Sequence, residues 1–222
     1  MIVAERKSIP EMMEILAGHK NVLVLGCGTC VTVCLAGGER EVGIVASALR
    51  MAARLRGVDL NIEEQTIERQ CDNVFIEKAA DAIGRNDAVL SLGCGAGVQA
   101  IAERYANKAV YAGLDTQFIG ILEERGVWTE KCSACGACVL ADYGGICPIT
   151  RCAKRLLNGP CGGSTELRCE ARADCQCAWQ LIYNRLKAIG QLDRLNRIVA
   201  PKNWSAHRDG GCRTIIREDH RI

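Results

Sequence analysis

Cysteine constrains this chain more than any other residue type, because 15 of the 222 residues are cysteines and only three are histidines. The count is odd, and the first residues contain no apolar region typical of a secretory signal, so a disulfide framework is disfavoured. Clustered thiolates instead favour soft metals, namely zinc or the iron of iron–sulfur clusters. The cysteine content therefore predicts metal chemistry in a reducing, cytoplasmic setting.

The cysteines also divide the chain. Five are spread over the first 131 residues, nine crowd between positions 132 and 177, and Cys212 stands alone near the end. In this cysteine-rich stretch the apolar runs end, and Gly144-Gly145 and Gly159-Pro160 break the chain into loops. We therefore expect an α/β domain over residues 1–127, a cysteine-rich iron–sulfur domain over residues 128–200 and a polar tail over residues 201–222.

The first domain alternates strand-like and helix-like segments. Short apolar runs predict strands at 21–26, 58–62, 88–92 and 109–112. Amphipathic stretches predict helices at 42–55, 72–83 and 97–105. Because this alternation is typical of a mainly parallel sheet covered by helices, the predicted fold is a Rossmann-like α/β domain. The second domain is predicted to be rich in loops, with helices only at 148–157 and 178–189.

The most specific motif begins the cysteine-rich domain. Cys132-x-x-Cys135-x-x-Cys138, followed by Cys147-Pro148, echoes the bacterial ferredoxin pattern, although the gap before Cys-Pro is longer. A second set of four ligands can be drawn from Cys152, Cys161, Cys169, Cys175 and Cys177. This second set lacks the paired C-x-x-C of a zinc site, which favours iron–sulfur clusters over zinc.

Cysteines of the α/β domain lie at the ends of the predicted segments. Cys27 and Cys30 follow the first strand, Cys71 precedes a helix, and Cys94 follows the third strand. Because the carboxyl ends of parallel strands meet at one edge of a sheet, these four are predicted to form a metal site. Cys34, one helical turn after Cys30, is a further candidate. The alternative is that these cysteines are small buried residues of the core.

Several other functions are disfavoured. The turns Gly26-x-Gly28 and Gly93-x-Gly95-x-Gly97 do not fit the dinucleotide-binding pattern, and we interpret them as turns that let backbone N–H groups approach cluster sulfurs. No catalytic acid, base or nucleophile is evident. A net charge of +2 and an aromatic content of 4% disfavour nucleic-acid binding, and no apolar run is long enough to span a membrane.

Three stretches resemble a known family. GICPITRCAKRLLNGPCGGS over residues 145–164, Arg168-Cys169-Glu170, and CAWQLIYNRL over residues 177–186 resemble the methylenetetrahydrofolate reductase C-terminal domain. VLVLGCGTCVTVCLAGGEREVGIVASALRMAARL over residues 22–55 resembles its companion half. Together they resemble the small iron–sulfur subunit of the two-subunit methylenetetrahydrofolate reductases of acetogenic bacteria.

The resemblance implies an electron-transfer subunit of one-carbon metabolism, in the Wood–Ljungdahl pathway. Its partner would be a (β/α)8-barrel subunit that binds FMN and reduces the methylene group. The resemblance is also compatible with further electron-donating subunits. This chain would be non-catalytic and carry two to three [4Fe–4S] clusters, with zinc as an alternative at one site. The family ligands map onto Cys27, Cys30, Cys71, Cys94, Cys132, Cys135, Cys138, Cys147, Cys152, Cys161, Cys169 and either Cys175 or Cys177.

Two alternatives to electron transfer remain open from the sequence. A zinc-stapled scaffold or activator of a partner enzyme would use the same cysteines without redox chemistry. A weaker alternative is an independent enzyme that uses a cluster as a Lewis acid. The sequence leaves Cys34, Cys212 and one member of the Cys175–Cys177 pair as candidate non-ligands.

Overall fold

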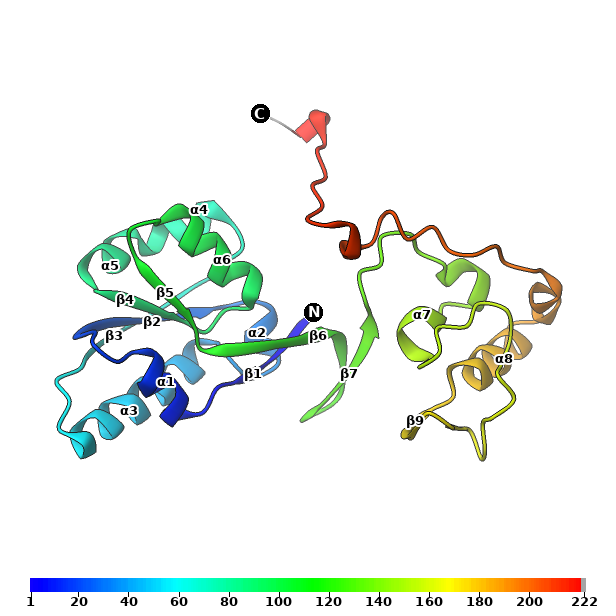
Figure 1. Cartoon of the computed structure of the whole chain (residues 1–222), viewed down its shortest axis with the longest axis horizontal. Coiled ribbons are helices and arrows are strands. Elements are labelled where there is room, and N and C mark those ends of the chain that lie inside the picture. The colour runs from blue at the N-terminus through cyan, green and yellow to red at the C-terminus, as the bar shows by residue number, and fades with distance from the viewer. Residues whose placement is uncertain (221–222) are drawn as a thin grey trace. The chain divides into compact units, whose positions relative to one another are not determined.

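The computed structural model describes residues 1–220 (Figure 1). The chain forms two compact units, Met1–Thr129 and Glu130–Ile222, here called unit 1 and unit 2. Each unit has its own buried core. None of the helices in the described part of the chain has the length and hydrophobicity needed to cross a membrane.

Unit 1 is built on a four-stranded parallel sheet, which confirms the predicted α/β class. Its strands are β2 (Asn21–Cys27), β3 (Asn61–Ile67), β4 (Ala88–Ser91) and β5 (Ala109–Ala112). They lie in the order β3-β2-β4-β5. The chain therefore passes from β2 to β3 on one side and then crosses to β4 on the other. Such a reversal is the point at which open α/β sheets bind ligands, beyond the carboxyl ends of the strands.

Helices cover both faces of this sheet (Figure 1). One face is covered by α1 (Ile9–Ile15) and α3 (Glu39–Arg56), and the other by α4 (Asn73–Ile76), α5 (Ala80–Arg85) and α6 (Gly95–Arg104). The short helices α2 (Cys30–Val33) and η1 (Glu77–Ala79) complete the unit. Alternate residues of β2 divide between two cores: Val22 and Val24 pack on one side, Leu23 and Leu25 on the other. This explains why β2 reads as a continuous apolar run.

A second sheet, not predicted from the sequence, joins the ends of unit 1. It contains β1 (Ile2–Arg6), β6 (Leu114–Glu124) and β7 (Val127–Cys132) in the order β1-β6-β7. β1 pairs antiparallel with β6 across more than a hundred residues of chain. Because β6 is mostly exposed, its sequence lacks the apolar run that marks a buried strand.

The second predicted strand was misplaced. Residues 58–62 were expected to form a strand, but β3 runs from Asn61 to Ile67 and pairs with β2 from Asn21↔Asn61 onward. Glu63 and Glu64 in β3 pair with Arg85 and Arg50 at the surface. An edge strand that carries ion-paired residues at the surface has a polar sequence. Hydrophobicity therefore gave no signal of where β3 runs.

Unit 2 has little regular structure, as expected. It contains η2 (Leu140–Tyr143), α7 (Pro148–Arg151), the hairpin of β8 (Arg168–Cys169) and β9 (Arg172–Gln176), α8 (Ala178–Ala188) and η3 (Leu192–Asn196). The predicted helix 148–157 was too long, because Cys152 leaves the helical region with φ −96° and ψ 119°. The carbonyls of Leu156 and Leu157 instead accept hydrogen bonds from Trp179 Nε1 and the Tyr143 hydroxyl.

The segment after residue 200 contains the short helices η4 (Arg208–Gly210) and η5 (Glu218–His220) and makes defined contacts within unit 2. Lys202 Nζ donates a hydrogen bond of 2.6 Å to the Ala137 carbonyl, and Arg213 Nη1 donates one of 3.0 Å to the Ala134 carbonyl. This segment therefore holds the loop that carries Cys132, Cys135 and Cys138.

Candidate metal centres

Three cysteines of unit 1 meet where the order of the parallel strands reverses. Cys27 is the last residue of β2, Cys71 follows β3, and Cys94 precedes α6 after β4. Burial raises the pKa of the Cys71 thiol, and the neighbouring Cys94 and Cys27 sulfurs raise it further. The fold thus places the thiols of Cys27 and Cys94 within electrostatic reach of the Cys71 thiol.

The other two cysteines of unit 1 differ in environment. Cys30 is half-buried at the start of α2. Cys34 belongs to the hydrophobic core, where its Sγ donates weak hydrogen bonds to the carbonyls of Ala4 at 3.7 Å and Val31 at 3.6 Å. Burial raises the pKa of the Cys34 thiol, which disfavours the thiolate that a metal requires. Cys34 therefore has the surroundings of a core residue.

Three N–H groups of the glycine-rich turns, which were predicted to approach cluster sulfurs, already have oxygen acceptors. The Gly28 N–H donates to the Ile67 carbonyl at 2.9 Å. The Gly93 N–H donates to Ser91 Oγ at 3.0 Å, and the Gly95 N–H donates to Thr116 Oγ1 at 2.8 Å. These three groups are committed within the fold and do not point to a sulfur or a phosphate.

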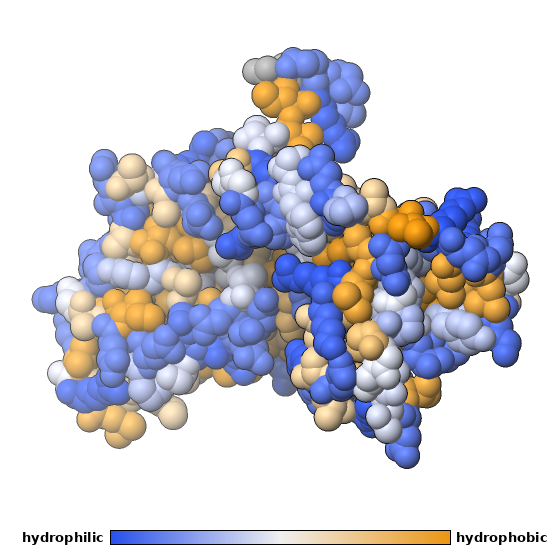
Figure 2. All heavy atoms as spheres, turned by 45° about the vertical axis from the view of Figure 1, so that its right-hand side comes forward, coloured by the Kyte–Doolittle hydropathy of each residue, from blue (hydrophilic) through white to orange (hydrophobic). Residues whose placement is uncertain are grey.

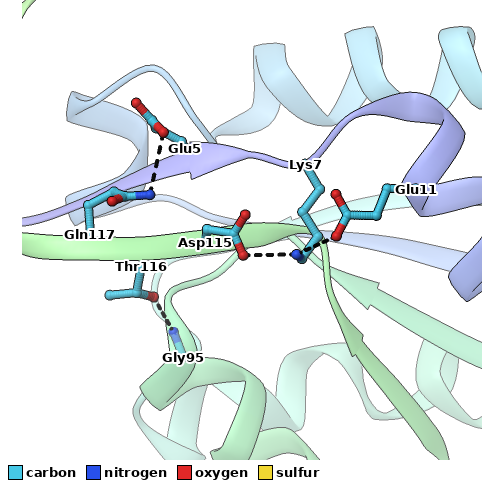
Figure 3. Close-up of polar contacts among 7 residues, drawn as sticks. All are labelled: Glu5, Lys7, Glu11, Gly95, Asp115, Thr116 and Gln117. Carbon is cyan, nitrogen blue, oxygen red and sulfur yellow. Dashed lines mark hydrogen bonds and ion pairs between the residues drawn. The ribbon is translucent and has the colours of Figure 1, made fainter.

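Figure 3 shows how the antiparallel sheet holds this region. Thr116 on β6 reaches the first residue of α6, Gly95, directly after Cys94. Asp115, the preceding residue of β6, forms an ion pair with Lys7 at 2.9 Å. Lys7 also forms an ion pair with Glu11 on α1 at 2.6 Å. Both carboxylates raise the pKa of Lys7, so the ammonium remains charged between them. β6 thereby links α1 to the start of α6.

Four cysteines of unit 2 line one small cavity. The cavity is bordered by Cys152, Cys161, Cys169 and Cys177. They come from the end of α7, the following loop, β8 and the residue before α8, so the early end of α7 and the short hairpin are what bring them together. Of the two alternatives left open by the sequence, Cys177 lines this cavity, whereas Cys175 lies in β9 and does not.

An ion pair borders the same cavity. Lys154 and Glu170 form a salt bridge, and Cys161 Sγ lies 3.3 Å from Glu170 Oε1. Hydrogen bonds from Lys154 and Cys161 hold the pKa of the Glu170 carboxyl below its usual value. Neither charged residue was predicted from the sequence to belong to a site, although Glu170 directly follows Cys169 in a stretch that carries the family resemblance.

The cysteines of the ferredoxin-like motif are more exposed. Cys132 and Cys138 are exposed, whereas Cys135 and Cys147 are half-buried. The Ala134 N–H points to Cys132 Sγ at 3.4 Å, as amides do around thiolate ligands. Positive φ angles at Ala134 (51°) and Gly136 (83°) curl this loop tightly. Cys147 Sγ donates a weak hydrogen bond of 3.7 Å to Thr150 Oγ1.

All 15 cysteines are free thiols, which suits a ligand role. Within residues 1–220, however, no three His, Cys, Asp or Glu side chains approach closely enough to hold a metal ion as they stand. Two groupings nevertheless have the donors that soft metals need: Cys27, Cys71 and Cys94 in unit 1, and the four cysteines around the cavity of unit 2.

A larger cavity lies beside the four-cysteine cavity. It encloses about 710 Å³ and shares Ser164 and Trp179 with the smaller one. Trp179 packs edge-on against Tyr143 with ring centroids 5.6 Å apart. Tyr183 and Ile198, which also line it, are 43% and 91% exposed. Unit 2 thus presents apolar surface directly next to its cysteines, and Figure 2 shows apolar side chains among the hydrophilic ones at the surface.

Comparison with known proteins gives one match. Residues 111–205 match the model of a family described as methylene-tetrahydrofolate reductase C terminal. This stretch contains the nine clustered cysteines from Cys132 to Cys177 and relates that part of the chain to methylenetetrahydrofolate reductases. The chain matches no curated protein and no solved structure.

Proposed function

We propose that this chain is the iron–sulfur electron-transfer subunit of a methylenetetrahydrofolate reductase complex in the cytoplasm. It passes electrons to the FMN of a (β/α)8-barrel partner, which reduces methylene-tetrahydrofolate to methyl-tetrahydrofolate. The observation that carries the proposal is the cavity lined by Cys152, Cys161, Cys169 and Cys177, because it lies inside the stretch that matches the reductase family.

The donor set fits iron and sulfur. Four thiols from four short elements surround one cavity, and four thiolates are what a [4Fe–4S] cluster uses. A cluster held there supplies one-electron transfer. The protein contributes the chemistry around it: Lys154 places a positive charge beside Cys161, and charge near cluster sulfurs is one of the factors that set a reduction potential.

We assign the remaining ligands to two further sites. Cys132, Cys135, Cys138 and Cys147 form the ferredoxin-like set, and Cys27, Cys30, Cys71 and Cys94 form the set in unit 1. For unit 1, the support is the mutual influence of Cys27, Cys71 and Cys94 at the switch point of the sheet. Zinc is the alternative at one of these sites.

A partner is supported by the apolar surface next to the four-cysteine cavity. Reducing the methylene group to a methyl group takes two electrons and two protons, so a one-electron carrier must deliver twice to a group that accepts both. Trp179 and Ser164 border both of these cavities, so a partner docked over Tyr183 and Ile198 would lie next to the residues that line the cysteine cavity. Exposed apolar patches of this kind mark interaction sites.

The test is a metal and sulfide count with two matched variants. The anaerobically purified chain is expected to be brown, to contain iron and acid-labile sulfide, and to lose its visible absorption with dithionite. Cys161→Ala should lower iron and sulfide by one cluster, whereas Cys175→Ala should leave both unchanged, because only Cys161 lines the cavity. A colourless protein that holds zinc without iron would instead establish a zinc-stapled scaffold.

A further inference from the structure

Gln70 is a buried polar residue of unit 1 that has no role in the proposed electron transfer. Its exposed fraction is 1%, and it directly precedes Cys71 in the loop after β3. A buried amide is costly unless both its donor and its acceptor are paired. The partners of Gln70 therefore indicate what holds this loop in place.

Those partners come from the other two loops of the site. Gln70 Nε2 donates a hydrogen bond of 2.8 Å to the carbonyl of Leu25, near the end of β2. Gln70 Oε1 accepts one of 2.5 Å from the Ser91 hydroxyl, at the end of β4. Ser91 Oγ in turn accepts the Gly93 N–H, next to Cys94. One side chain thus ties together the segments that carry Cys27, Cys71 and Cys94.

The glycine run after β4 is shaped to receive this side chain. A Cβ atom at Gly93 would lie 2.3 Å from Gln70 Oε1, and one at Gly97 would lie 2.7 Å from Gln70 Cβ. Neither separation is compatible with a side chain larger than hydrogen, because both residues face Gln70 within the buried core. Gly93 and Gly97 are therefore explained by the packing of Gln70, and no bound phosphate is needed to account for them.

We propose that Gln70 is the positioning residue of the unit 1 thiolate site: by linking Leu25, Ser91 and Gly93, it holds Cys71 opposite Cys94 before any metal binds. This inference rests on the proposed function for the metal, but the position of the thiols can be measured without one. A hydrogen-bonded partner behind a ligand is expected to affect metal affinity by fixing the ligand's orientation.

The first test measures the spacing of the thiols in the metal-free, reduced full-length chain. Dibromobimane links two thiols that lie close together, and mass spectrometry of the peptides identifies each linked pair. The native chain is expected to yield links between Cys71 and either Cys94 or Cys27. Gln70→Met removes both hydrogen bonds at similar volume and should lower the rate of these links about tenfold, as should the smaller change Ser91→Ala.

The control separates positioning from general loss of stability. Ile83→Val removes one buried methyl group from a hydrophobic cluster of unit 1 and keeps both hydrogen-bond partners of Gln70, so it should leave the linking rate unchanged. Equal linking rates in the native chain, Gln70→Met and Ser91→Ala would overturn the proposal. So would an equal fall in Ile83→Val, since Gln70 would then act only through stability.

The second test adds the metal. Zn²⁺ is expected to slow the alkylation of Cys27, Cys71 and Cys94 by iodoacetamide in the native chain. In Gln70→Met it should protect Cys71 and Cys94 about tenfold less, with Cys152 and Cys161 in unit 2 protected as before. Absence of zinc protection in the native chain would refute the unit 1 metal site, while the linking rates would still decide whether Gln70 positions the thiols.

Discussion

Unit 2 should depend on a very small core, and Ile182→Ala tests this directly. The hydrophobic cluster of unit 2 contains five buried side chains in the described residues, against 20 and nine in the two clusters of unit 1. Ile182 on α8 is fully buried among the five. Its replacement by alanine removes three carbon atoms, worth about 0.8 kcal/mol each in transfer free energy, or about 2.4 kcal/mol together. The cavity left behind brings the expected loss to about 3–4 kcal/mol.

That loss should unfold unit 2 when no metal is bound. A loss of 3–4 kcal/mol shifts the unfolding equilibrium by roughly two to three powers of ten, and small loop-rich units often need a metal to stay folded. We expect the reduced, chelator-treated Ile182→Ala chain to exchange the amide hydrogens of α8 within the fastest measured time, while those of β2 stay protected. Hydrogen–deuterium exchange with peptide mass spectrometry measures both in one experiment.

Two variants provide the controls. Lys187→Ala changes an exposed residue of the same helix and should leave α8 exchange near native. Ile83→Ala makes the same chemical change in unit 1, and should raise exchange around β2 and α5 without affecting α8. Protected α8 amides in metal-free Ile182→Ala would refute the claim that this small core limits the stability of unit 2.

Three further outcomes are expected. Backbone N–H groups at the start of β2 hold the pKa of Asp87 below its usual value, so its stabilisation is complete above about pH 4 and is lost as the pH falls through the lower folded-state pKa. Asp87→Asn should therefore have a lower urea midpoint than the native chain at pH 7, and the difference between the two midpoints should shrink in acid. A difference that stays constant with pH would contradict this. Cys34→Ala should leave the iron and zinc content unchanged, because its sulfur donates to the Ala4 and Val31 carbonyls within the core; metal loss would make it a ligand. Gly136→Ala should lower the free energy of unfolding by ~1 kcal/mol or more and speed amide exchange over residues 201–213. The reason is that Gly136 has φ +83° and a Cβ there would lie 2.3 Å from the Ala206 carbonyl oxygen. Exchange as slow as in the native chain over residues 201–213 would contradict this.

The parallel sheet was predictable because its strands are buried on both faces. Such strands read as apolar runs, and β2, β4 and β5 lie where those runs predict them. The polar edge strand β3 was misplaced, and the sheet of β1, β6 and β7 was missed. In both cases the strands pair through their backbones and expose their side chains, so hydrophobicity carries little signal of them.

For the site, the sequence by itself determined which atoms are available: many thiols, few histidines, and cysteines placed at strand ends and in a ferredoxin-like motif. It also predicted that Cys27, Cys30, Cys71 and Cys94 would approach one edge, because the carboxyl ends of parallel strands must lie together.

Only the tertiary structure decided which thiols line one cavity. The early end of α7 brings Cys152 to the cavity with Cys177, whereas Cys175 remains in the hairpin. Packing places Cys34 in the core, and the partners of Gln70 are revealed only when three loops distant in sequence meet. Spacing along a chain fixes separations over a few residues, whereas these choices depend on which segments pack together.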